Sequence, residues 1–539
     1  MRCDHCGAGN AANYVACQSC GRRRVIRPPG LAAPAVAPPA RHSMAAPAPA
    51  AFGGVTTIQA PAQAPTPTVG AGGGRYAKDA TRYLCAALQL DAALNARVLR
   101  GTLGEPLRAI ASSPGVDLVT VLRYGIAATR RQAARNVTLV ILAVLAVVAA
   151  AAADTSAPLL LLLPVAWLLA FWERYVTLYH VLARELRREN FDPAKAPLPP
   201  GDRLRRRLDE IAARDRGNVT VFPAYAPFIG FGSPVTEWST VVNTAAPAPG
   251  RTVERFSVDA LHRHVAADLE RLGLPGVSVE DRLFVNGLDL LGEMDPALTR
   301  QILPDEMRAP LAQLDQRLLD DRRADGKGRC RPYLMVRITG WSGEVVLTLF
   351  LRFALLPDRD LLFIEASSAL LPPVRQKYRE ADRLTSAPAP RQVARLLGQA
   401  ATLAPGQLVG SVPYVLAMVA EPLGAWLKAR RDARQIRLER SFNYGAVLAP
   451  RELAHENRFY RYFQRLDKEM YVKIAERRIL DSIQDFMRRH GIDTSEFAES
   501  QTVLINNGLI TSGNAKFEGP VAAGPMARVM SRIQRAEKK

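Results

Sequence analysis

Four cysteines close to the amino terminus have the residue type and the spacing of a metal site. They occur in two Cys-x-x-Cys-Gly units, residues 3–7 and 17–21. Four thiolates at this spacing can converge tetrahedrally on one metal ion such as zinc. The glycine after each unit permits a tight turn in which backbone N–H groups point at the sulfurs. The candidate metal ligands are Cys3, Cys6, Cys17 and Cys20.

This segment resembles a zinc ribbon over residues 1–24, and we recognise no family from the sequence in the rest of the chain. The resemblance implies a small knuckle-and-hairpin structure with one structural Zn²⁺ held by the four cysteines, and a role in binding other proteins. A rubredoxin-like iron site is an alternative. His5 lies between two ligands, but the set is complete without it. A second alternative is contact with nucleic acid through the basic run Arg22, Arg23 and Arg24.

The location of the whole chain depends on a long apolar stretch, residues 137–172, whose single charge is Asp154. Residues 137–153 form the first run, and residues 159–172 form the second. The first run gives roughly 25 Å of helix, slightly short of a bilayer core of about 30 Å, so both runs must extend into the interface. We expect a transmembrane helical hairpin over residues 136–179. A helical hairpin buried in a soluble protein is the alternative, and it would require a large protein shell.

Positive charge predicts the orientation of the hairpin. The connecting turn has no basic residue, whereas arginines flank both runs. These are Arg123, Arg130, Arg131 and Arg135 before the first run, and Arg174, Arg184, Arg187 and Arg188 after the second. Basic flanks remain in the cytoplasm, so we expect a multi-pass protein of the plasma membrane with both termini cytoplasmic. The amino terminus has no signal peptide, so targeting falls to the hairpin.

The composition fits a membrane-associated protein but does not specify one. The chain has 539 residues, a formal net charge of +20 and a pI near 10.1. This balance suits contact with anionic lipid, and it also suits nucleic acid. The excess of arginine, together with abundant alanine and proline, is also typical of a bacterium with a GC-rich genome. The charge therefore has an explanation that requires no function.

The remaining chain divides by composition and periodicity. Residues 25–74, rich in Pro, Ala and Gly, cannot bury enough apolar surface to fold, so we expect a disordered linker. Helical spacing over residues 75–135 predicts a juxtamembrane helical region. The further segments are a cytosolic α+β domain (180–455), a long amphipathic helix (456–500), and a short-strand hairpin with a basic tail (501–539).

The α+β domain is predicted from strand-like runs separated by helical ones. The strand-like runs are residues 218–222, 333–339, 344–353 and 361–366, and the helical ones include residues 202–214, 258–272 and 312–322. Short turns between the later strands favour an antiparallel sheet built from hairpins. The fold class is therefore multi-domain: a zinc ribbon, a two-helix transmembrane hairpin and a soluble α+β domain.

Three further segments allow more than one interpretation. Residues 408–427 are apolar but contain Pro413, Glu421 and Pro422, which favours a place in the core or on the membrane surface over a further span or re-entrant helix. The glycine-bearing loop 228–234 lacks the pattern of a phosphate loop, so we expect a tight structural loop. Residues 456–524 could mediate homo-oligomerisation, although packing on the same domain is favoured.

No catalytic motif occurs in the chain. His262 and His264 are two residues apart in a predicted helix and suit one metal poorly, and Cys85 and Cys330 are expected to be buried thiols. We therefore expect a non-enzymatic membrane scaffold or sensor whose partners are the lipid bilayer and other proteins. One alternative is a membrane-tethered nucleic-acid-binding protein. The other is an enzyme with an unrecognised site in the α+β domain.

Overall fold

The computed structural model describes residues 78–324, 328–356 and 360–498. The chain divides into two units, Met1–Thr68 and Val69–Lys539, and the described residues all belong to the second. The predicted zinc ribbon, the linker 25–74 and the strand tail 501–539 lie outside the described residues.

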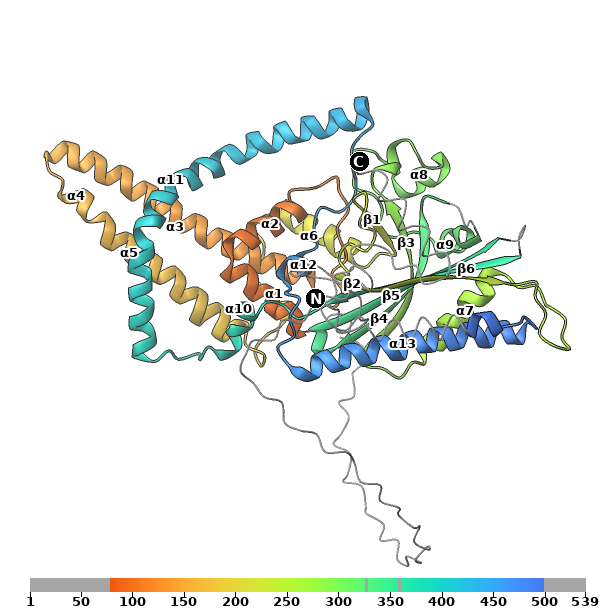
Figure 1. The fold of residues 1–539 in the computed structure, drawn as a ribbon. Helices are drawn as coiled ribbons and strands as arrows, with labels where there is room; N and C mark the ends of the chain where they lie inside the picture. Colours follow the sequence, from red (N-terminus) through yellow and green to blue (C-terminus); the bar gives the residue numbers. More distant parts are fainter. Residues whose placement is uncertain (1–77, 325–327, 357–359, 499–539) are drawn as a thin grey trace, which may run out of the picture. The chain divides into compact units, whose positions relative to one another are not determined.

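The first part of the described chain is helical (Figure 1). Its elements are α1 (Lys78–Leu90), α2 (Ala92–Thr102), α3 (Leu118–Ala153), α4 (Ala157–Leu160), α5 (Leu162–Tyr175), the π-helical η1 (Val176–Glu185), the 3₁₀ turn η2 (Pro193–Lys195) and α6 (Asp202–Asp215). The second part holds the strands β1 (Val219–Phe222), β2 (Ser233–Asn243), β3 (Val277–Asn286), β4 (Arg331–Gly340), β5 (Val345–Leu356) and β6 (Leu361–Leu371).

Helices cover the sheet and follow it. They are α7 (Val258–Glu270), η3 (Asp289–Leu291), α8 (Pro296–Ile302), α9 (Gln316–Ala324), η4 (Trp341–Gly343), α10 (Gln376–Arg379), η6 (Glu380–Arg383), α11 (Pro390–Arg434), η7 (Gln435–Glu439), α12 (Pro450–Ala454) and α13 (Tyr462–Arg489). The amphipathic helix predicted from residue 456 therefore begins at Tyr462.

The apolar stretch forms a helical hairpin. Helix α3 is 36 residues long, and its first turn is capped by Asp117, whose carboxylate accepts from the Thr120 N–H at 3.2 Å. It ends at Asp154, which has a left-handed backbone (φ 50°) that reverses the chain toward α4 and α5. The last part of the predicted juxtamembrane region, from Leu118, is thus continuous with the first apolar run, whereas α1 and α2 are separate helices. Three segments, Leu118–Ala153, Ala157–Glu185 and Pro390–Glu439, are long and apolar enough to cross a membrane.

The six strands form one mixed sheet in the order β1-β3-β4-β5-β6-β2. The predicted antiparallel pairing is confirmed for β4, β5 and β6. It is wrong for the edge strand β1, which pairs in parallel with β3. The chain between these two strands travels to the opposite edge as β2 and returns through α7, so no hairpin forces them to run antiparallel.

The sequence missed β2 and β3 for physical reasons. Strand β2 is an edge strand whose residues are mostly exposed or half-buried, so its alternation of apolar and polar residues is weak. Strand β3 carries the charged run Glu280, Asp281 and Arg282 at its centre. Both patterns are typical of a loop when they are read without their neighbours.

Each face of the sheet has its own core. Helices α7 and α13 pack on one face through the alternate residues of β4, β5 and β6. On the other face lies an aromatic cluster in which Phe228 stacks on Phe350 with ring centroids 4.0 Å apart and meets Phe284 and Tyr333 edge-on. The predicted loop around Phe228 therefore closes this second core.

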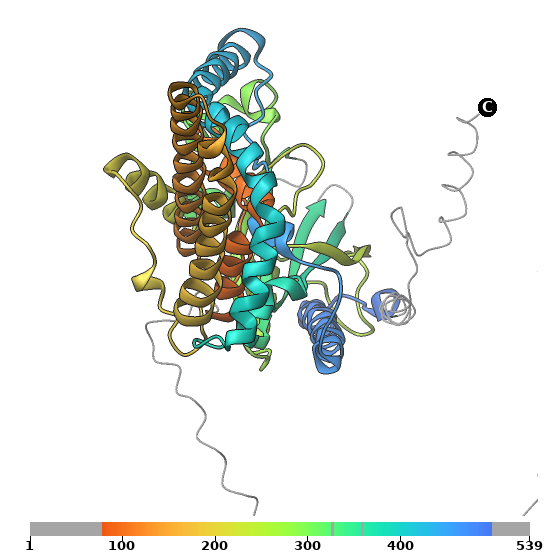
Figure 2. The same ribbon diagram turned by 90° about the vertical axis from the view of Figure 1, so that its left-hand side faces the viewer.

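Helix α11 is a single helix of 45 residues that contains Pro405, Pro413 and Pro422. The prolines do not end the helix, and the segment 408–427, which contains Pro413 and Pro422, lies within it. Figure 1 shows α11 passing beside α5 and α3 and changing direction along its length, as prolines inside a helix allow. Figure 2 shows α11 beside the two hairpin helices from a second direction.

Candidate functional site at the base of the helical hairpin

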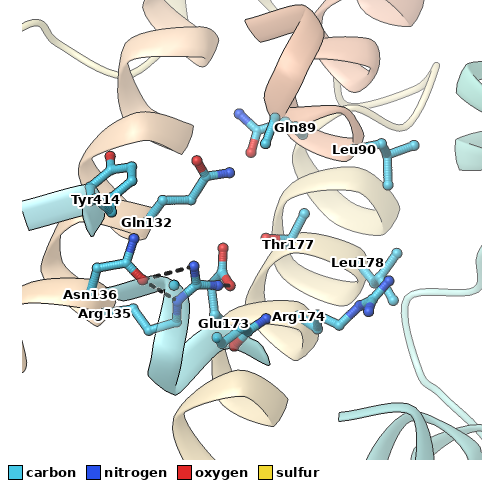
Figure 3. Close-up of a pocket in the computed structure, with 13 residues that line it drawn as sticks. Gln89, Leu90, Gln132, Arg135, Asn136, Glu173, Arg174, Thr177, Leu178 and Tyr414 are labelled. Atoms are coloured by element: carbon cyan, nitrogen blue, oxygen red, sulfur yellow. Dashed lines mark hydrogen bonds and ion pairs between the residues drawn. The ribbon is translucent and has the colours of Figure 1, made fainter. Parts of the chain in front are cut away.

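A cavity of about 430 Å³ lies where α1, α3, α5, η1 and α11 meet, and we call it the basal pocket. Its polar lining comes from several elements (Figure 3). Helix α3 contributes Gln132, Arg135 and Asn136, while α5 and η1 contribute Glu173, Arg174 and Thr177. The remaining polar wall is formed by Gln89 of α1 and by Gln407 and Tyr414 of α11.

The position of the pocket follows from the ends of the two apolar runs. Asn136 is the last polar residue before the first run, and Glu173 and Arg174 directly follow the second. Because the runs are antiparallel neighbours in a hairpin, these residues come together at its base. Helix α11 closes the pocket from the side, where Leu139, Ala166 and Ala404 form a small buried cluster.

Most of the charge in the pocket is internally compensated. Arg135 forms an ion pair with Glu173, and both side chains are largely buried. Its guanidinium also donates from Nε and Nη2 to Asn136 Oδ1, at 3.1 and 3.0 Å. Arg135 is therefore held by both Glu173 and Asn136, and the Arg135–Glu173 ion pair carries no net charge.

Arg174 differs from Arg135. It is half-buried, and within the described residues it has no hydrogen bond, ion pair or ring contact. Thr177, Gln132 and Gln407 also line the pocket without a side-chain hydrogen bond to any described residue, and the Gln407 Oε1 atom is buried. Among the described residues, the pocket thus offers one cation without an ion-pair partner and several side chains without a hydrogen bond.

Aromatic residues surround the same level of the hairpin. Tyr175 stacks on Trp172 with centroids 6.4 Å apart, and it contacts Phe171 and Tyr179 at 5.8 and 5.2 Å. Amphipathic rings of this kind favour the level of lipid headgroups.

The residues predicted as functional lie elsewhere. The predicted metal ligands, Cys3, Cys6, Cys17 and Cys20, and the basic run Arg22, Arg23 and Arg24 are outside the described residues. Within residues 78–324, 328–356 and 360–498 no group of three or more His, Cys, Asp or Glu residues could hold a metal ion.

The two histidines of α7 face different carboxylates, as their spacing predicts. His262 Nε2 lies 2.6 Å from Asp281 Oδ1, and His264 Nε2 lies 3.8 Å from Asp485 Oδ2. Burial alone would raise the pKa of Asp281, but His262 and Arg323 outweigh burial and lower it. Asp281 is therefore a charged partner of His262 and Arg323.

The glycine-bearing loop 228–234 is a structural loop, as predicted. The N–H groups of Gly230 and Gly232 donate to one oxygen of Glu452, at 2.7 and 2.8 Å. Both glycines have positive φ, 96° and 100°, which orients these N–H groups toward a common point. The loop is an anion cradle that is filled by a carboxylate of the same chain. Cys85 and Cys330 are buried thiols, also as predicted.

Comparison with known families locates a domain in this fold. A family model described as an AbeC-like domain matches residues 237–518, which is just over half of the chain. The chain belongs to the AbeC-like domain family. Searches of curated proteins and of solved structures find no match.

The AbeC-like domain contains most of β2, the strands β3 to β6, helices α7 to α13, and therefore all of α11. The hairpin lies outside the matched residues. The basal pocket thus combines a wall from the family domain, Gln407 and Tyr414, with walls from the amino-terminal helices.

Sequence reasoning missed the basal pocket. Polar residues at the edges of apolar runs, such as Asn136 and Glu173, were visible, but they read as the ordinary ends of membrane helices. The contribution of Gln407 depends on α11 packing against the hairpin. That contact joins segments more than 200 residues apart and leaves no local pattern.

Proposed function

We propose that this protein is a non-enzymatic membrane scaffold or sensor, anchored by the hairpin and with the rest of its folded mass in the cytoplasm. The amino-terminal zinc ribbon and the AbeC-like domain would bind other proteins. We use the term hairpin for residues 137–172 and the term body for the described residues outside the hairpin and α11.

The exposure of the hairpin supports membrane insertion. Only 11% of the most apolar window in each hairpin helix is buried. Its large apolar side chains point outward, with exposed fractions that include Leu145 at 58%, Leu160 at 70% and Trp172 at 63%. A continuous apolar surface of this length would be unstable in water, and lipid is the solvent that suits it.

An even number of crossings at the hairpin is supported by the contacts of the helices that flank it. Helix α1 precedes the hairpin, and α10, η6 and α12 follow it, yet all belong to one core. Arg82 of α1 forms an ion pair with Asp382, and the Tyr83 hydroxyl donates to the same carboxylate at 2.5 Å. Two segments that share a core must lie on one side of a membrane, so the chain between them crosses twice or not at all.

The same argument applies to α11, and it carries the proposal. Arg451, which follows α11, donates to Pro114 O at 2.6 Å and to Gly343 O at 2.5 Å. Pro114 precedes the hairpin, and Gly343 lies between the hairpin and α11. One buried side chain therefore joins the three segments that the candidate spans separate. If α11 crossed the membrane once, Arg451 would lie on the opposite side from Pro114 and Gly343, and these hydrogen bonds could not form. We therefore propose that α11 lies along the membrane beside the hairpin.

The cytoplasmic side is assigned from charge. The arginines beside the hairpin lie at its base, with the body, and its turn carries none. Basic residues near the ends of spans are retained in the cytoplasm.

Cysteine accessibility in intact and opened cells tests this arrangement. The variants are Ser156→Cys in the turn, Ser386→Cys before α11 and Asn457→Cys after it, all at exposed positions. An impermeant maleimide is expected to label the first in intact cells and the other two only after lysis. Mass spectrometry of peptides identifies the labelled residue, so the native cysteines can remain.

Two results would overturn the proposal. Labelling of Asn457→Cys from outside would mean that α11 crosses the membrane. Extraction of the full-length chain without detergent would mean that the hairpin is not inserted.

A further inference from the structure

We propose that the basal pocket binds the phosphate of an anionic phospholipid headgroup. This inference rests on the proposed function, because a headgroup reaches the pocket only if the hairpin is inserted in a bilayer. The proposed function includes a membrane anchor, and this inference names a specific lipid group that the anchored protein would bind.

The position of the pocket matches the depth of headgroups. The pocket lies where the apolar runs end, at the level of Trp172 and Tyr175, whose rings stack. Beyond it the large exposed side chains of the hairpin helices are apolar, and exposed polar residues return at the turn, Asp154 to Ser156. On the other side of the pocket the charged body begins. A volume of about 430 Å³ lies within the range of small-ligand pockets, about 300–1,000 Å³.

The charge of the pocket suits one anion. Arg135 and Glu173 cancel each other, and Arg174 remains without a partner among the described residues. Arg131, one helical turn before Arg135, donates to Gln89 at the rim. A guanidinium donates two parallel hydrogen bonds to a phosphate, and such charge-assisted bonds are stronger than neutral ones. Arg174 therefore provides the principal contact.

The neutral polar groups complete the site. Thr177 is nine-tenths buried, with an exposed fraction of 9%, and its hydroxyl has no hydrogen-bond partner in the described chain. Gln132, which Figure 3 shows, and Gln407 both line the pocket and add amide groups to it. Unsatisfied polar groups in an apolar environment cost free energy, and a bound phosphate with its ester oxygens would satisfy several of them.

Helix α11 makes the site conditional on its own position. Trp167 of α5 donates from Nε1 to Leu397 O at 2.8 Å, which fixes α11 against the hairpin. Gln407 and Tyr414 reach the pocket only in that position. Lipid binding and the packing of α11 should therefore stabilise each other.

Lipid retention in nanodiscs provides the test. The full-length chain is purified in detergent, and its affinity for fluorescent phosphatidylglycerol is measured in nanodiscs of phosphatidylcholine. Arg174→Gln removes the uncompensated cation. Arg184→Gln is the matched control, because Arg184 is exposed, lies at the same end of the hairpin and is outside the pocket. We expect Arg174→Gln to weaken binding roughly tenfold, the equivalent of about 1.4 kcal/mol, and Arg184→Gln to change it less than twofold.

The outcomes separate the possible sources of the phosphate. Equal losses in both variants would mean general electrostatic attraction and would overturn the proposal. Competition by inorganic phosphate at the same concentration as the lipid would assign the pocket to a soluble anion and would also overturn it. Ser156→Cys combined with Arg174→Gln should still be labelled from outside the cell. Loss of that labelling would instead count against the membrane anchor itself.

Discussion

The hairpin helices and α11 have similar apolar composition but opposite relations to the body. All three segments are long enough to span a bilayer, and each buries the same 11% of its most apolar window. The hairpin leaves the body and returns to it within one apolar stretch. Helix α11 is joined to the body at both ends. The turn η6 before it contacts α1, and Ile436 after it is buried in a core with β1 and β3.

This difference shows that hydropathy measures whether a helix can enter a membrane, while the contacts of the flanking segments decide whether it crosses. Lys428, near the end of α11, pairs with Glu105 of the body at 2.9 Å. Trp426 lies under Arg430 at 4.0 Å, an arrangement suited to an interface between lipid and water. In the proposed arrangement, we expect the apolar face of α11 between these anchors to contact lipid along the membrane.

The largest effect is expected from Arg451→Met, which removes the side chain that joins the three segments. The side chain is 1% exposed, and burial lowers its pKa to about 9 while the Glu344 carboxylate opposes that shift. Its loss leaves the carbonyls of Pro114 and Gly343 unpaired, so we expect destabilisation of about 3 kcal/mol or more. Thermal unfolding in detergent, followed by tryptophan fluorescence, measures it. Arg458→Met, at an exposed position, is the control, and an equal change in both variants would contradict the role of Arg451.

Next in size is the contrast between Leu145→Arg in the hairpin and Val419→Arg in α11. Both side chains are exposed, at 58% and 70%. An arginine near the centre of a span costs about 2.5–3.5 kcal/mol on insertion, whereas one at the interface reaches water at little cost. We expect Leu145→Arg to reduce the membrane-inserted fraction strongly and Val419→Arg to leave it nearly unchanged. Carbonate extraction of membranes measures both, and equal losses would place α11 across the bilayer.

The sequence predicted the elements that depend on local pattern. The hairpin, α6, α7 and the strands β4, β5 and β6 were recognised because continuous apolar runs, helical periodicity and turn residues lie within short windows. Strand β1 was recognised, but its parallel pairing with β3 was not, and the edge strand β2 and the charged strand β3 were missed. The partners of these strands are distant in the sequence or follow no hairpin turn.

The basal pocket lay beyond prediction for a related reason. A single arginine such as Arg174, which has no ion-pair partner among the described residues, is ordinary at the end of a helix predicted to enter a membrane. Whether Arg174 can bind a ligand depends on whether another residue pairs with it. The adjacent acid, Glu173, forms its ion pair with Arg135 of the other helix instead. Pairing across helices is set by packing geometry, which no spacing rule in one chain encodes.

A smaller effect is expected at Glu452, whose carboxylate fills the glycine cradle in the body. Burial raises its pKa above the ordinary 4.5, although the N–H groups of Gly232 and Gly230 oppose this rise. The protonated form therefore favours the folded state, and this contribution is present below pH 4.5 and lost as the pH rises through the raised pKa. We expect Glu452→Gln to gain stability relative to the parent chain between pH 4.5 and neutrality. Parallel curves of melting temperature against pH would refute this, and Glu237→Gln, at an exposed position, is the control.

The smallest effect on the hairpin and body is expected from removal of the predicted zinc. We expect about one equivalent of zinc per chain by elemental mass spectrometry, because four thiolates form a closed tetrahedral site. The double substitution Cys17→Ser and Cys20→Ser should abolish it, while Cys330→Ala, at a buried thiol of the body, should leave it intact. Neither the labelling of Ser156→Cys nor the melting of the body should change when zinc is lost, because the hairpin and its flanking core contain none of the four ligands. Iron in place of zinc would identify the site as the rubredoxin-like alternative. A loss of membrane anchoring on zinc removal would show that the folding of the ribbon and that of the hairpin are coupled.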